Sequence, residues 1–468
     1  MKNLNVTIIL NIIFILFNQS IFAQTPVSGN QSGTWTLSHS PYQVTGDVTI
    51  PSGQTLSIEA GVQIVFQGYY RIYVNGKIEA NGSNNNLIVF TPADQNAGWG
   101  GIRLDGTPDI SIFHYCKFEY GKTSATGSYP DMHGGAVVIK DADAQFYNCI
   151  FSHNDATGDD DGMGGAVYTM NSGSSTQTLT KFEDCLFEYN HAYGEGGAIK
   201  FTNDGNSEIT RCQFIGNTSN YGAGAIMFYT AENFHLTQCL FYMNSTNNSG
   251  GGALKSLNPQ TSLNIANCTF VYNTAYGAGE GGAADFDYAD VSIVNSIFYG
   301  NNQTYGKDIN VGQSTTVDIN YSDVDMPDYA TGDHNLNNVN PLFVNPSQGD
   351  FHLQADSPCI DAGLDIGLPY NGSAPDMGCY EYNGAGIDDL SGIGISIYPN
   401  HVQNQLFIKQ KKPKNIDIKL IDHTGRAVLS LQSGQQLIPI QLDNFASGVY
   451  QILITRQNRL YLQKIIIR

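Results

Sequence analysis

Four carboxylates crowd one short segment of the chain. Asp155 is followed by Gly158-Asp-Asp-Asp-Gly162, which places Asp159, Asp160 and Asp161 in a row between two glycines. Carboxylate oxygens on a flexible loop are ligands that Ca²⁺ prefers. The spacing matches neither an EF-hand nor a nonapeptide calcium repeat, and a solvated acidic loop is the competing interpretation. Ca²⁺ is therefore the one cofactor that the sequence suggests, held by these four aspartates.

Tyrosines recur at one place in a series of loops. Each precedes a glycine, and the four are Tyr193, Tyr221, Tyr276 and Tyr305. If the loops lie on one side of the molecule, the rings form a platform that could bind sugar rings. Amphipathic aromatic side chains can equally stack on one another and shield turns. The four tyrosines are thus candidate binding residues with a structural alternative.

Acid–base groups are present, but no pair of them stands out. Asp131, His133, His153 and His191 are candidates, yet carboxylates are too numerous to choose the opposed pair that a glycosidase needs. The sequence shows no phosphate loop, catalytic-triad spacing or zinc signature. Catalytic residues therefore stay unassigned, and the question of enzymatic activity stays open.

A repeat must position these residues. Cys-x-Phe, two residues, Asn, a loop and then Gly-Gly-Ala recur at intervals of 33, 36, 27, 27, 29 and 28 residues. The copies begin at Cys116, Cys149, Cys185, Cys212, Cys239, Cys268 and Ser296. Such a period is typical of stacked coils that bury one continuous core. The serine in the last copy favours packed cysteines over a metal ladder or a chain of disulfides.

The strand pattern of the repeat predicts columns of like residues. Cys and Phe, two residues apart, share one face of a strand and should stack on their equivalents about 4.8 Å away. The asparagines three residues after each Phe form a matching column, and an Asn amide can bond the coils on both sides. Lys200 and Lys255 each follow Gly-Gly-Ala by two residues, so they should share one face, where we expect them to be solvated. The fold class is therefore all-β, a parallel β-helix with a small C-terminal β-sandwich.

Composition divides the chain into four parts. Residues 1–23 read as a secretory signal peptide, with Lys2, an apolar run and Ala23 before the expected cleavage site. The predicted β-helix covers 24–383, a glycine-containing linker covers 384–394, and alternating short strands fill 395–468. No later run is long enough to span a membrane. Cys359 and Cys379 lie outside the repeat column, and in an exported protein we expect them to form a disulfide.

Charge is distributed unevenly along the chain. Residues 24–383 hold 11 Lys/Arg against 37 Asp/Glu, whereas residues 395–468 hold 10 Lys/Arg against 3 Asp/Glu. A body this acidic repels phosphate backbones, so nucleic acid is not an expected partner.

The repeat resembles those of right-handed parallel β-helix proteins, both pectate-lyase-like proteins and polymorphic outer-membrane proteins, which share Phe-x-x-Asn and Gly-Gly-Ala. The resemblance covers about residues 34–382, and residues 340–346, 349–353 and 357–363 resemble the closing coils of secreted β-helix proteins. It implies the fold, but this fold hosts lyases, hydrolases, adhesins and inert spikes.

The C-terminal part resembles the type A sorting domain of the type IX (Por) secretion system. The matching segments are Ile397–Asn400, Leu406–Ile408, Leu420–Gly425, Phe445–Tyr450 and Gln463–Arg468. His401 departs from the usual proline of the opening motif. The resemblance implies export across the outer membrane and removal of this domain.

These observations favour an exported, cell-surface or secreted protein that binds glycans or acts as an adhesin. A polysaccharide lyase or glycoside hydrolase is the alternative. The expected partners are the type IX secretion machinery and extracellular polysaccharide. The identity of the glycan, the oligomeric state and the choice between release and surface anchoring stay open.

Overall fold

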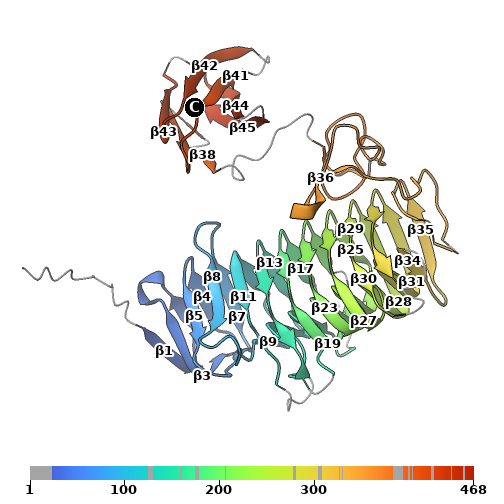
Figure 1. Cartoon of the computed structure of the whole chain (residues 1–468). Helices are drawn as coiled ribbons and strands as arrows, with labels where there is room; N and C mark the ends of the chain where they lie inside the picture. The colour runs from blue at the N-terminus through green and yellow to red at the C-terminus, as the bar shows by residue number, and fades with distance from the viewer. Residues whose placement is uncertain are drawn as a thin grey trace, which may run out of the picture. The chain divides into compact units, whose positions relative to one another are not determined.

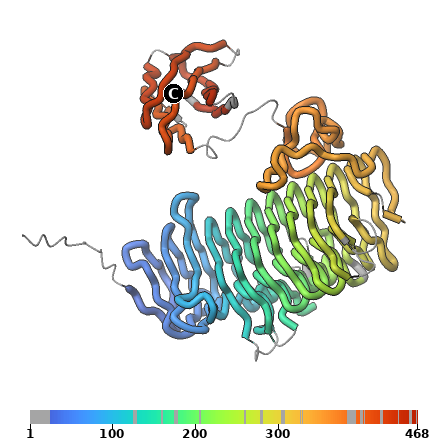
Figure 2. Tube along the Cα trace, in the orientation of Figure 1, coloured from blue at the N-terminus to red at the C-terminus, as the bar shows by residue number. Residues whose placement is uncertain are grey.

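The first part of the chain is a stack of coils built from parallel strands. The computed structural model describes residues 24–468, apart from 125–129, 159–160, 174–178, 206, 278–280, 304–307, 326, 329, 383–393, 399–400, 403, 423–425, 444, 457–458 and 468. The chain divides into two compact units, residues 1–339 and 340–468. In the first unit the coils form three stacks of parallel strands (Figure 1). A few long strands belong to two stacks, so that the three stacks are joined into one 29-stranded sheet. The trace in Figure 2 shows successive coils lying side by side.

Stack 1 holds the Cys-x-Phe strands and the earlier strands in register with them. Its members in pairing order are β1 (Thr25–Asn30), β3 (Tyr42–Ile50), β5 (Gln63–Phe66), β8 (Ile88–Pro92), β11 (Cys116–Glu119), β14 (Ile150–Ser152), β18 (Leu186–Glu188), β22 (Gln213–Ile215), β26 (Leu240–Tyr242), β29 (Thr269–Val271) and β32 (Ile297–Tyr299).

Stack 2 holds the strands that follow Gly-Gly-Ala. It continues from β3 through β6 (Ile72–Val74), β9 (Ile102–Asp105), β12 (Val137–Lys140), β16 (Val167–Met170), β20 (Ile199–Gly205), β24 (Ile226–Glu232), β28 (Leu254–Ala266), β31 (Ala284–Val294) and β34 (Ile309–Val311).

Stack 3 holds the strands that precede each Cys-x-Phe. It runs through β2 (Gly33–Trp35), β4 (Thr55–Glu59), β7 (Lys77–Asn81), β10 (Ser111–His114), β13 (Ala144–Tyr147), β17 (Thr180–Glu183), β21 (Glu208–Thr210) and β25 (Phe234–Thr237), then the second halves of β28 and β31, and β35 (Thr316–Asn320). A short 3₁₀ turn, η1 (Leu37–His39), lies between β2 and β3.

A fourth, shorter sheet forms directly after the asparagine column. This corner sheet consists of β15 (Asp155–Ala156), β19 (His191–Glu195), β23 (Thr218–Tyr221), β27 (Ser245–Ser249), β30 (Thr274–Ala275) and β33 (Asn302–Gln303), all parallel. Its strands are short because the loops that follow differ in length from coil to coil.

Columns of identical residues fill the core of the coils. Eight phenylalanines of stack 1 lie face to face, with ring centroids 4.5–4.9 Å apart. They are Phe90, Phe118, Phe151, Phe187, Phe214, Phe241, Phe270 and Phe298. The spacing is the strand separation of a sheet, as the repeat predicted. Burying each ring contributes about 1.5–3 kcal/mol, which a single isolated coil could not achieve.

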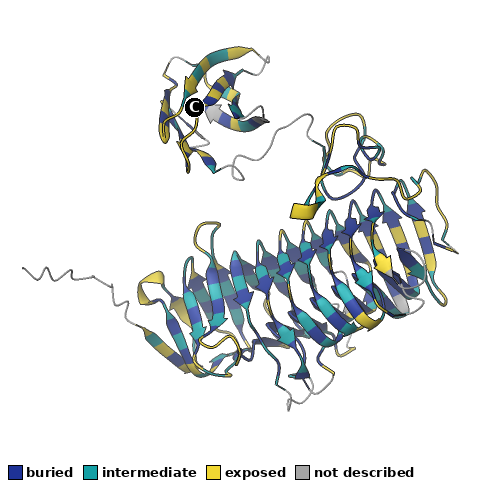
Figure 3. Cartoon of the chain, viewed as in Figure 1, coloured by how far each residue is buried: buried dark blue, intermediate teal, exposed yellow. Residues whose placement is uncertain are grey.

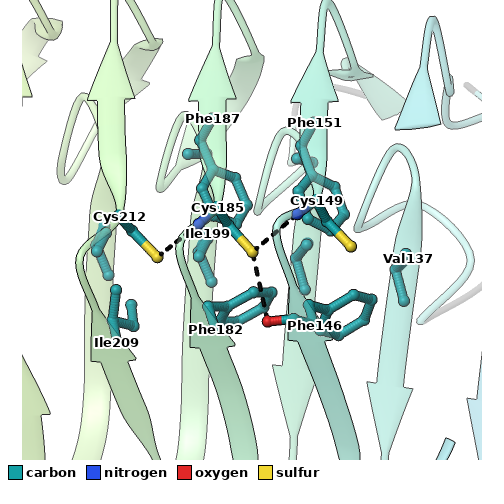
Figure 4. Close-up of a cluster of buried hydrophobic side chains, with 14 of the residues drawn as sticks. Val137, Phe146, Cys149, Phe151, Phe182, Cys185, Phe187, Ile199, Ile209 and Cys212 are labelled. Carbon is teal, nitrogen blue, oxygen red and sulfur yellow. Dashed lines mark hydrogen bonds between the residues drawn. The ribbon is translucent and has the colours of Figure 1, made fainter. Parts of the chain in front are cut away.

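The cysteines form a second buried column beside the rings (Figure 4). The backbone N–H of Cys149 points to Sγ of Cys185 at 3.4 Å, and that of Cys185 to Sγ of Cys212 at 3.4 Å. Burial raises the pKa of the Cys149 and Cys185 thiols well above the ordinary value, so they stay protonated. The Ser296 hydroxyl takes the same place below Cys268 at 3.1 Å. The column is a packing feature, filled by a small side chain in each coil.

The second unit is antiparallel except for the parallel pairing of β39 with β45. A hairpin of β36 (Phe343–Asn345) and β37 (Asp350–Leu353), joined by η3 (Pro346–Gln348), is followed by two sheets that enclose one apolar core. The first sheet contains β38 (Ile395–Tyr398), β40 (Gln405–Gln410) and β43 (Leu437–Gln441). The second contains β39 (His401–Val402), β45 (Arg459–Ile467), β44 (Gly448–Arg456), β41 (Ile416–Ile421) and β42 (Ala427–Ser433).

The predicted fold class is confirmed, an all-β chain with a parallel β-helix and a small antiparallel C-terminal sandwich. The limits at residues 383 and 394 stay a prediction, and residues 1–23 and most of 384–394 lie outside the described part of the chain.

Candidate functional site

The asparagine column forms a continuous hydrogen-bonded ladder. Asn190 shows the pattern, because its Nδ2 donates to Phe151 O at 2.9 Å and to Oδ1 of Asn217 at 2.9 Å. Its own Oδ1 accepts from the backbone N–H and the Nδ2 of Asn154 at 3.0 and 2.9 Å. The same contacts recur through Asn244, Asn273 and Asn301. The amides therefore bond the coils on both sides, as predicted, and fix the corner from which the corner sheet begins.

The corner sheet carries mostly uncharged polar side chains, together with the carboxylates of Asp155 in β15 and Glu195 in β19. Half-buried residues begin four of its strands, namely His191, Thr218, Ser245 and Thr274. Nδ1 of His191 lies 2.9 Å from the Thr218 hydroxyl. Further along the strands, Nδ2 of the exposed Asn247 donates to Oδ1 of the half-buried Asn220 at 2.9 Å. This face thus offers hydroxyl and amide groups, which suit hydrogen bonds to sugar hydroxyls.

Of the predicted tyrosines, Tyr193 lies within β19, Tyr221 ends β23 and Tyr276 directly follows β30. Tyr221 and Tyr276 have exposed fractions of 44% and 61%, and Tyr193 is half-buried. The rings of Tyr193 and Tyr221 are 6.5 Å apart and tilted by 56°. Tyr305 lies outside the described residues. The structure therefore brings two of the four into ring contact and displays a third on the same sheet.

A second row of residues, which the sequence analysis missed, lies just before the corner-sheet strands and contains several aromatic side chains. In each coil the residue before the asparagine position has a left-handed backbone, with φ between 53° and 66°. We call these residues the turn row: Tyr120, His153, Tyr189, Gly216, Met243, Tyr272 and Gly300. The Tyr120 and His153 rings are 5.3 Å apart, and the His153 and Tyr189 rings 5.4 Å apart.

The two glycines of the turn row each follow a tyrosine-bearing coil for a packing reason. A Cβ on Gly216 would lie 2.8 Å from Cε1 of Tyr189, and one on Gly300 would lie 2.7 Å from Cε1 of Tyr272. The tyrosines thus cover the glycines of the next coil. Exposed fractions of 55% for Tyr189 and 54% for Met243 leave much of this row at the surface. The glycines at 216 and 300 were the sequence signal for this left-handed position.

The predicted Ca²⁺ loop is only partly described. Asp155 begins β15, and its Oδ1 has no hydrogen-bond partner among the described residues. Burial raises the pKa of Asp155, against the opposing effect of His191 and Lys122. Asp161 is exposed, while Asp159 and Asp160 lie outside the described residues. The described residues contain no cluster of three or more His, Cys, Asp or Glu that could hold a metal ion, so Ca²⁺ binding stays a prediction.

Figure 3 shows that most of the coil strands are coloured as buried or half-buried. A column of outward residues on stack 2 shares this low exposure although it faces away from the core, with six members buried and three half-buried. In register it consists of Tyr73, Arg103, Val138, Tyr168, Lys200, Met227, Lys255, Asp285 and Asn310. The predicted solvation of its lysines is wrong, because Lys200 is only 5% exposed and the Lys255 side chain 11%. Both do lie in one column, as expected.

The charges of this column are paired by residues before Gly-Gly-Ala and by the column itself. Lys200 Nζ lies 2.5 Å from Oε2 of Glu195 and 2.9 Å from Sδ of Met163. Lys255 Nζ lies 2.6 Å from Oδ2 of the buried Asp285. Each lysine thus has a carboxylate partner, which lowers the cost of burying its charge.

Histidine behaves differently at the start of the column. His133 is 1% exposed, its Nδ1 accepts the Met163 backbone N–H at 3.2 Å, and its ring lies 4.6 Å from that of Tyr168. Burial, with the charges of Lys200 and Arg103, lowers the pKa of His133 to about 4. His133 is therefore neutral at physiological pH and is held as a packed acceptor.

Family comparisons agree with this architecture. Residues 29–138 match a pectate-lyase like β-helix domain, and residues 184–202 match a Chlamydia polymorphic membrane protein repeat. Residues 396–468 match the secretion system C-terminal sorting domain. This protein is a β-helix substrate of the type IX secretion system. No curated protein and no solved structure matches the chain.

The sorting-domain match indicates how this type IX substrate is exported. The match begins before His401, so that departure from the motif does not disturb the sorting domain. Such a domain directs export across the outer membrane to the surface or the medium. In the described residues, no helix has the length and apolar character needed to span a bilayer.

The disulfide predicted for this exported protein is not formed in the structure. Cys359 and Cys379 are both buried, and the described residues contain no disulfide. Cys359 lies in a turn where its carbonyl accepts the Met377 N–H at 2.9 Å and its own N–H donates to the Ser357 hydroxyl at 3.2 Å. A backbone hydrogen bond of Cys359 holds this segment to the turn around Met377.

Proposed function

We propose that this type IX substrate binds extracellular glycans through its corner sheet. The observation that carries the proposal is the composition of that sheet's outer face, where exposed tyrosines stand beside hydroxyl and amide side chains. Tyr221 and Tyr276 supply ring surface, and Thr218, Ser245 and Thr274 supply hydrogen-bonding groups. Sugars are commonly held by this combination of apolar ring contact and polar groups.

The turn row extends this surface toward the other end of the strands. Bulky side chains in a left-handed backbone cost of order 1–3 kcal/mol each, and glycine would avoid that cost. The chain has glycine at only two of the seven turn-row positions. Two tyrosines of the row protect those glycines, which is a structural reason for them. Tyr120 and His153 cover no glycine; their rings contact each other at 5.3 Å, and His153 is exposed, which supports a display role for His153.

Binding is tested by retention of the exported protein on a panel of insoluble polysaccharides. We expect retention of the parent chain and a loss of at least fivefold in the Tyr221→Ser/Tyr276→Ser variant, because two stacking contacts at about 1 kcal/mol each disappear. Tyr370→Ser is the matched control, since Tyr370 is 38% exposed on the other unit. Equal retention of all three chains would reject the corner sheet as the binding surface.

A polysaccharide lyase or hydrolase is the second candidate. It is favoured by the column on stack 2, where Lys255 Nζ lies 2.6 Å from Asp285 and 3.9 Å from Asp287, groups able to move protons. The same polysaccharides, incubated with and without Ca²⁺, distinguish the two functions. New reducing ends or absorbance of unsaturated product would indicate an enzyme, whereas retention without cleavage would indicate a binding protein.

A further inference from the structure

Two arginines share one carboxylate near the start of stack 2. Arg103 is the middle of β9 and pairs in register with Tyr73 on one side and Val138 on the other. Arg71 lies just before β6, and the exposed fractions of the Arg71 and Arg103 side chains are 14% and 5%. Arg71 Nη1 lies 3.0 Å from Oδ2 of Asp131, and Arg103 Nε lies 3.5 Å from Oδ1 of the same residue.

The charges around this pair do not balance. Burial, followed by the charge of Arg71, lowers the pKa of Arg103 to about 10, so Arg103 is still charged at neutral pH. His133 is neutral there because burial lowers its pKa to about 4. Residues 125–129, which lie outside the described part, contain no Asp or Glu in the sequence. In the described part of the chain, the buried Arg103, the half-buried Arg71 and the single carboxylate of Asp131 therefore leave one positive charge.

The guanidinium groups also retain unused donors. Nη1 of Arg103 donates to Ile102 O and Gly134 O at 3.2 and 3.3 Å. Its Nη2 and Nε have no hydrogen-bond acceptor among the described residues, and neither has Nε of Arg71. Tyr73 accepts a hydrogen bond from Arg71 Nη1 at 3.2 Å, and the Tyr69 ring centroid lies 5.6 Å from the Arg71 guanidinium carbon. Unpaired donors on a buried cation are costly, at least 1–3 kcal/mol for each group.

The other cations on stack 2 show how unusual this arrangement is. Lys200 and Lys255 each have a carboxylate of their own, Glu195 and Asp285, within 2.6 Å. The lysine pairs are balanced locally, whereas the arginine pair needs a further anion. A group with two or more oxygens fits best, because a guanidinium donates two parallel hydrogen bonds to such a group.

We propose that Arg71 and Arg103 form a binding site for one anionic group of a ligand, a carboxylate or a sulfate, with Asp131 neutralising one of the two guanidinium charges. The site lies on stack 2 and does not depend on the corner sheet. It would give a ligand with acidic substituents a fixed attachment point on a body that is otherwise strongly acidic.

The test measures binding of sodium glucuronate and of sodium sulfate to the full exported chain by calorimetry and NMR titration, with glucose as the uncharged probe. We expect saturable binding of the anions and none of glucose. Binding of glucuronate alone would assign the site to sugar carboxylates, and equal binding of sulfate would extend it to sulfate. Absence of saturable binding of both anions would overturn the proposal.

Variants separate this site from general electrostatic attraction. Asp131→Asn raises the local charge and should tighten anion binding by about tenfold, whereas a merely structural role for Asp131 predicts no tightening. Arg103→Met should abolish binding, and Arg71→Met, at the more exposed position, provides the same test if Arg103→Met does not fold. Lys140→Met removes a charge from the exposed pair with Asp105 and is the matched control, with unchanged affinity expected. Retained binding in a folded Arg103→Met or Arg71→Met variant would also contradict the site.

Discussion

Two buried carboxylates stand out near the last described coils. Asp323 is fully buried, with Oδ1 accepting the Val339 N–H at 2.8 Å and Oδ2 without a hydrogen-bond partner in the described part of the chain. Asp308 is 7% exposed. Burial raises the pKa of both residues to about 6. At pH values between the ordinary pKa of 3.8 and the raised pKa of about 6, these two carboxyl groups are therefore protonated in the native coils and ionised in the unfolded chain.

This shift has a definite sign for stability. Because the native pKa of Asp323 is about 6 and the unfolded value is 3.8, its contribution to stability is greatest near pH 4 and decreases as pH rises toward 6. We expect the free energy of local opening of residues 309–339 to be about 1–3 kcal/mol higher near pH 5 than near pH 7, as measured by hydrogen exchange. Asp323→Asn keeps an acceptor for Val339 and should reduce this pH dependence by about half. The same dependence in the variant would assign it to other groups.

Among the elements, the asparagine ladder stabilises neighbouring coils in both directions. Asn217 is fully buried, accepts from Asn190 and donates to Phe187 O and to Asn244, all at 2.9–3.1 Å. Removing its side chain takes away the acceptor of the Asn190 backbone N–H and a donor to Phe187 O, and it leaves Asn190 Nδ2 and Asn244 Oδ1 with one fewer hydrogen bond each. The ladder begins at Gly121. Its backbone N–H donates to Asn154 Oδ1 at 2.8 Å, but glycine has no side-chain amide to continue the ladder.

Asn217→Ala should destabilise the coil stack by about 3–5 kcal/mol, since several buried polar groups lose their partners at about 1–3 kcal/mol each. Denaturant unfolding, followed by tyrosine fluorescence, measures the change. Asn247→Ala is the control, because Asn247 is exposed and bonds only Asn220 at the surface. Its effect should stay within about 0.5 kcal/mol. Similar small effects for both variants would show that the ladder is not a major source of stability.

The ladder and the ring columns could be predicted from sequence because each depends on residues that recur at one position of the repeat. The burial of Lys200 could not, because it depends on a loop of the same coil, through Glu195, and on a loop of the preceding coil, through Met163. The turn row was hidden for another reason. Tyrosine at a left-handed position leaves no pattern in one copy, and only Gly216 and Gly300 in equivalent copies reveal the backbone requirement.

For the whole molecule, the sorting domain and the proposed binding surface lie in different parts of the chain. Residues 24–383 are strongly acidic and residues 395–468 basic, and the sorting-domain match covers 396–468. We propose that the segment around 384–394 is where the sorting domain is removed after export. The mature protein would then present the β-helix alone, with a more acidic isoelectric point than the full chain.

Deletion of residues 395–468 should retain the chain in the periplasm of a host with a type IX system, while the full chain reaches the surface or medium. Cell fractionation and immunoblotting measure the distribution, and a fall of at least tenfold in the external fraction is expected. Fusion of the same residues to a signal-bearing reporter should export the reporter. A truncated chain that reaches the medium at the parental level would show that the sorting domain is dispensable.

Three successive asparagines of the ladder are equally spaced, so a single coil could be duplicated as a complete structural unit. Asn190, Asn217 and Asn244 follow one another at 27 residues, and each amide presents one acceptor to the coil before it and one donor to the coil after it. A tandem duplication of 27 residues would therefore insert a coil whose amide bonds are complete from the start. Gene duplication can lengthen or shorten this protein in whole coils without a new fold, so loops with new binding properties can be acquired while the ancestral core is preserved.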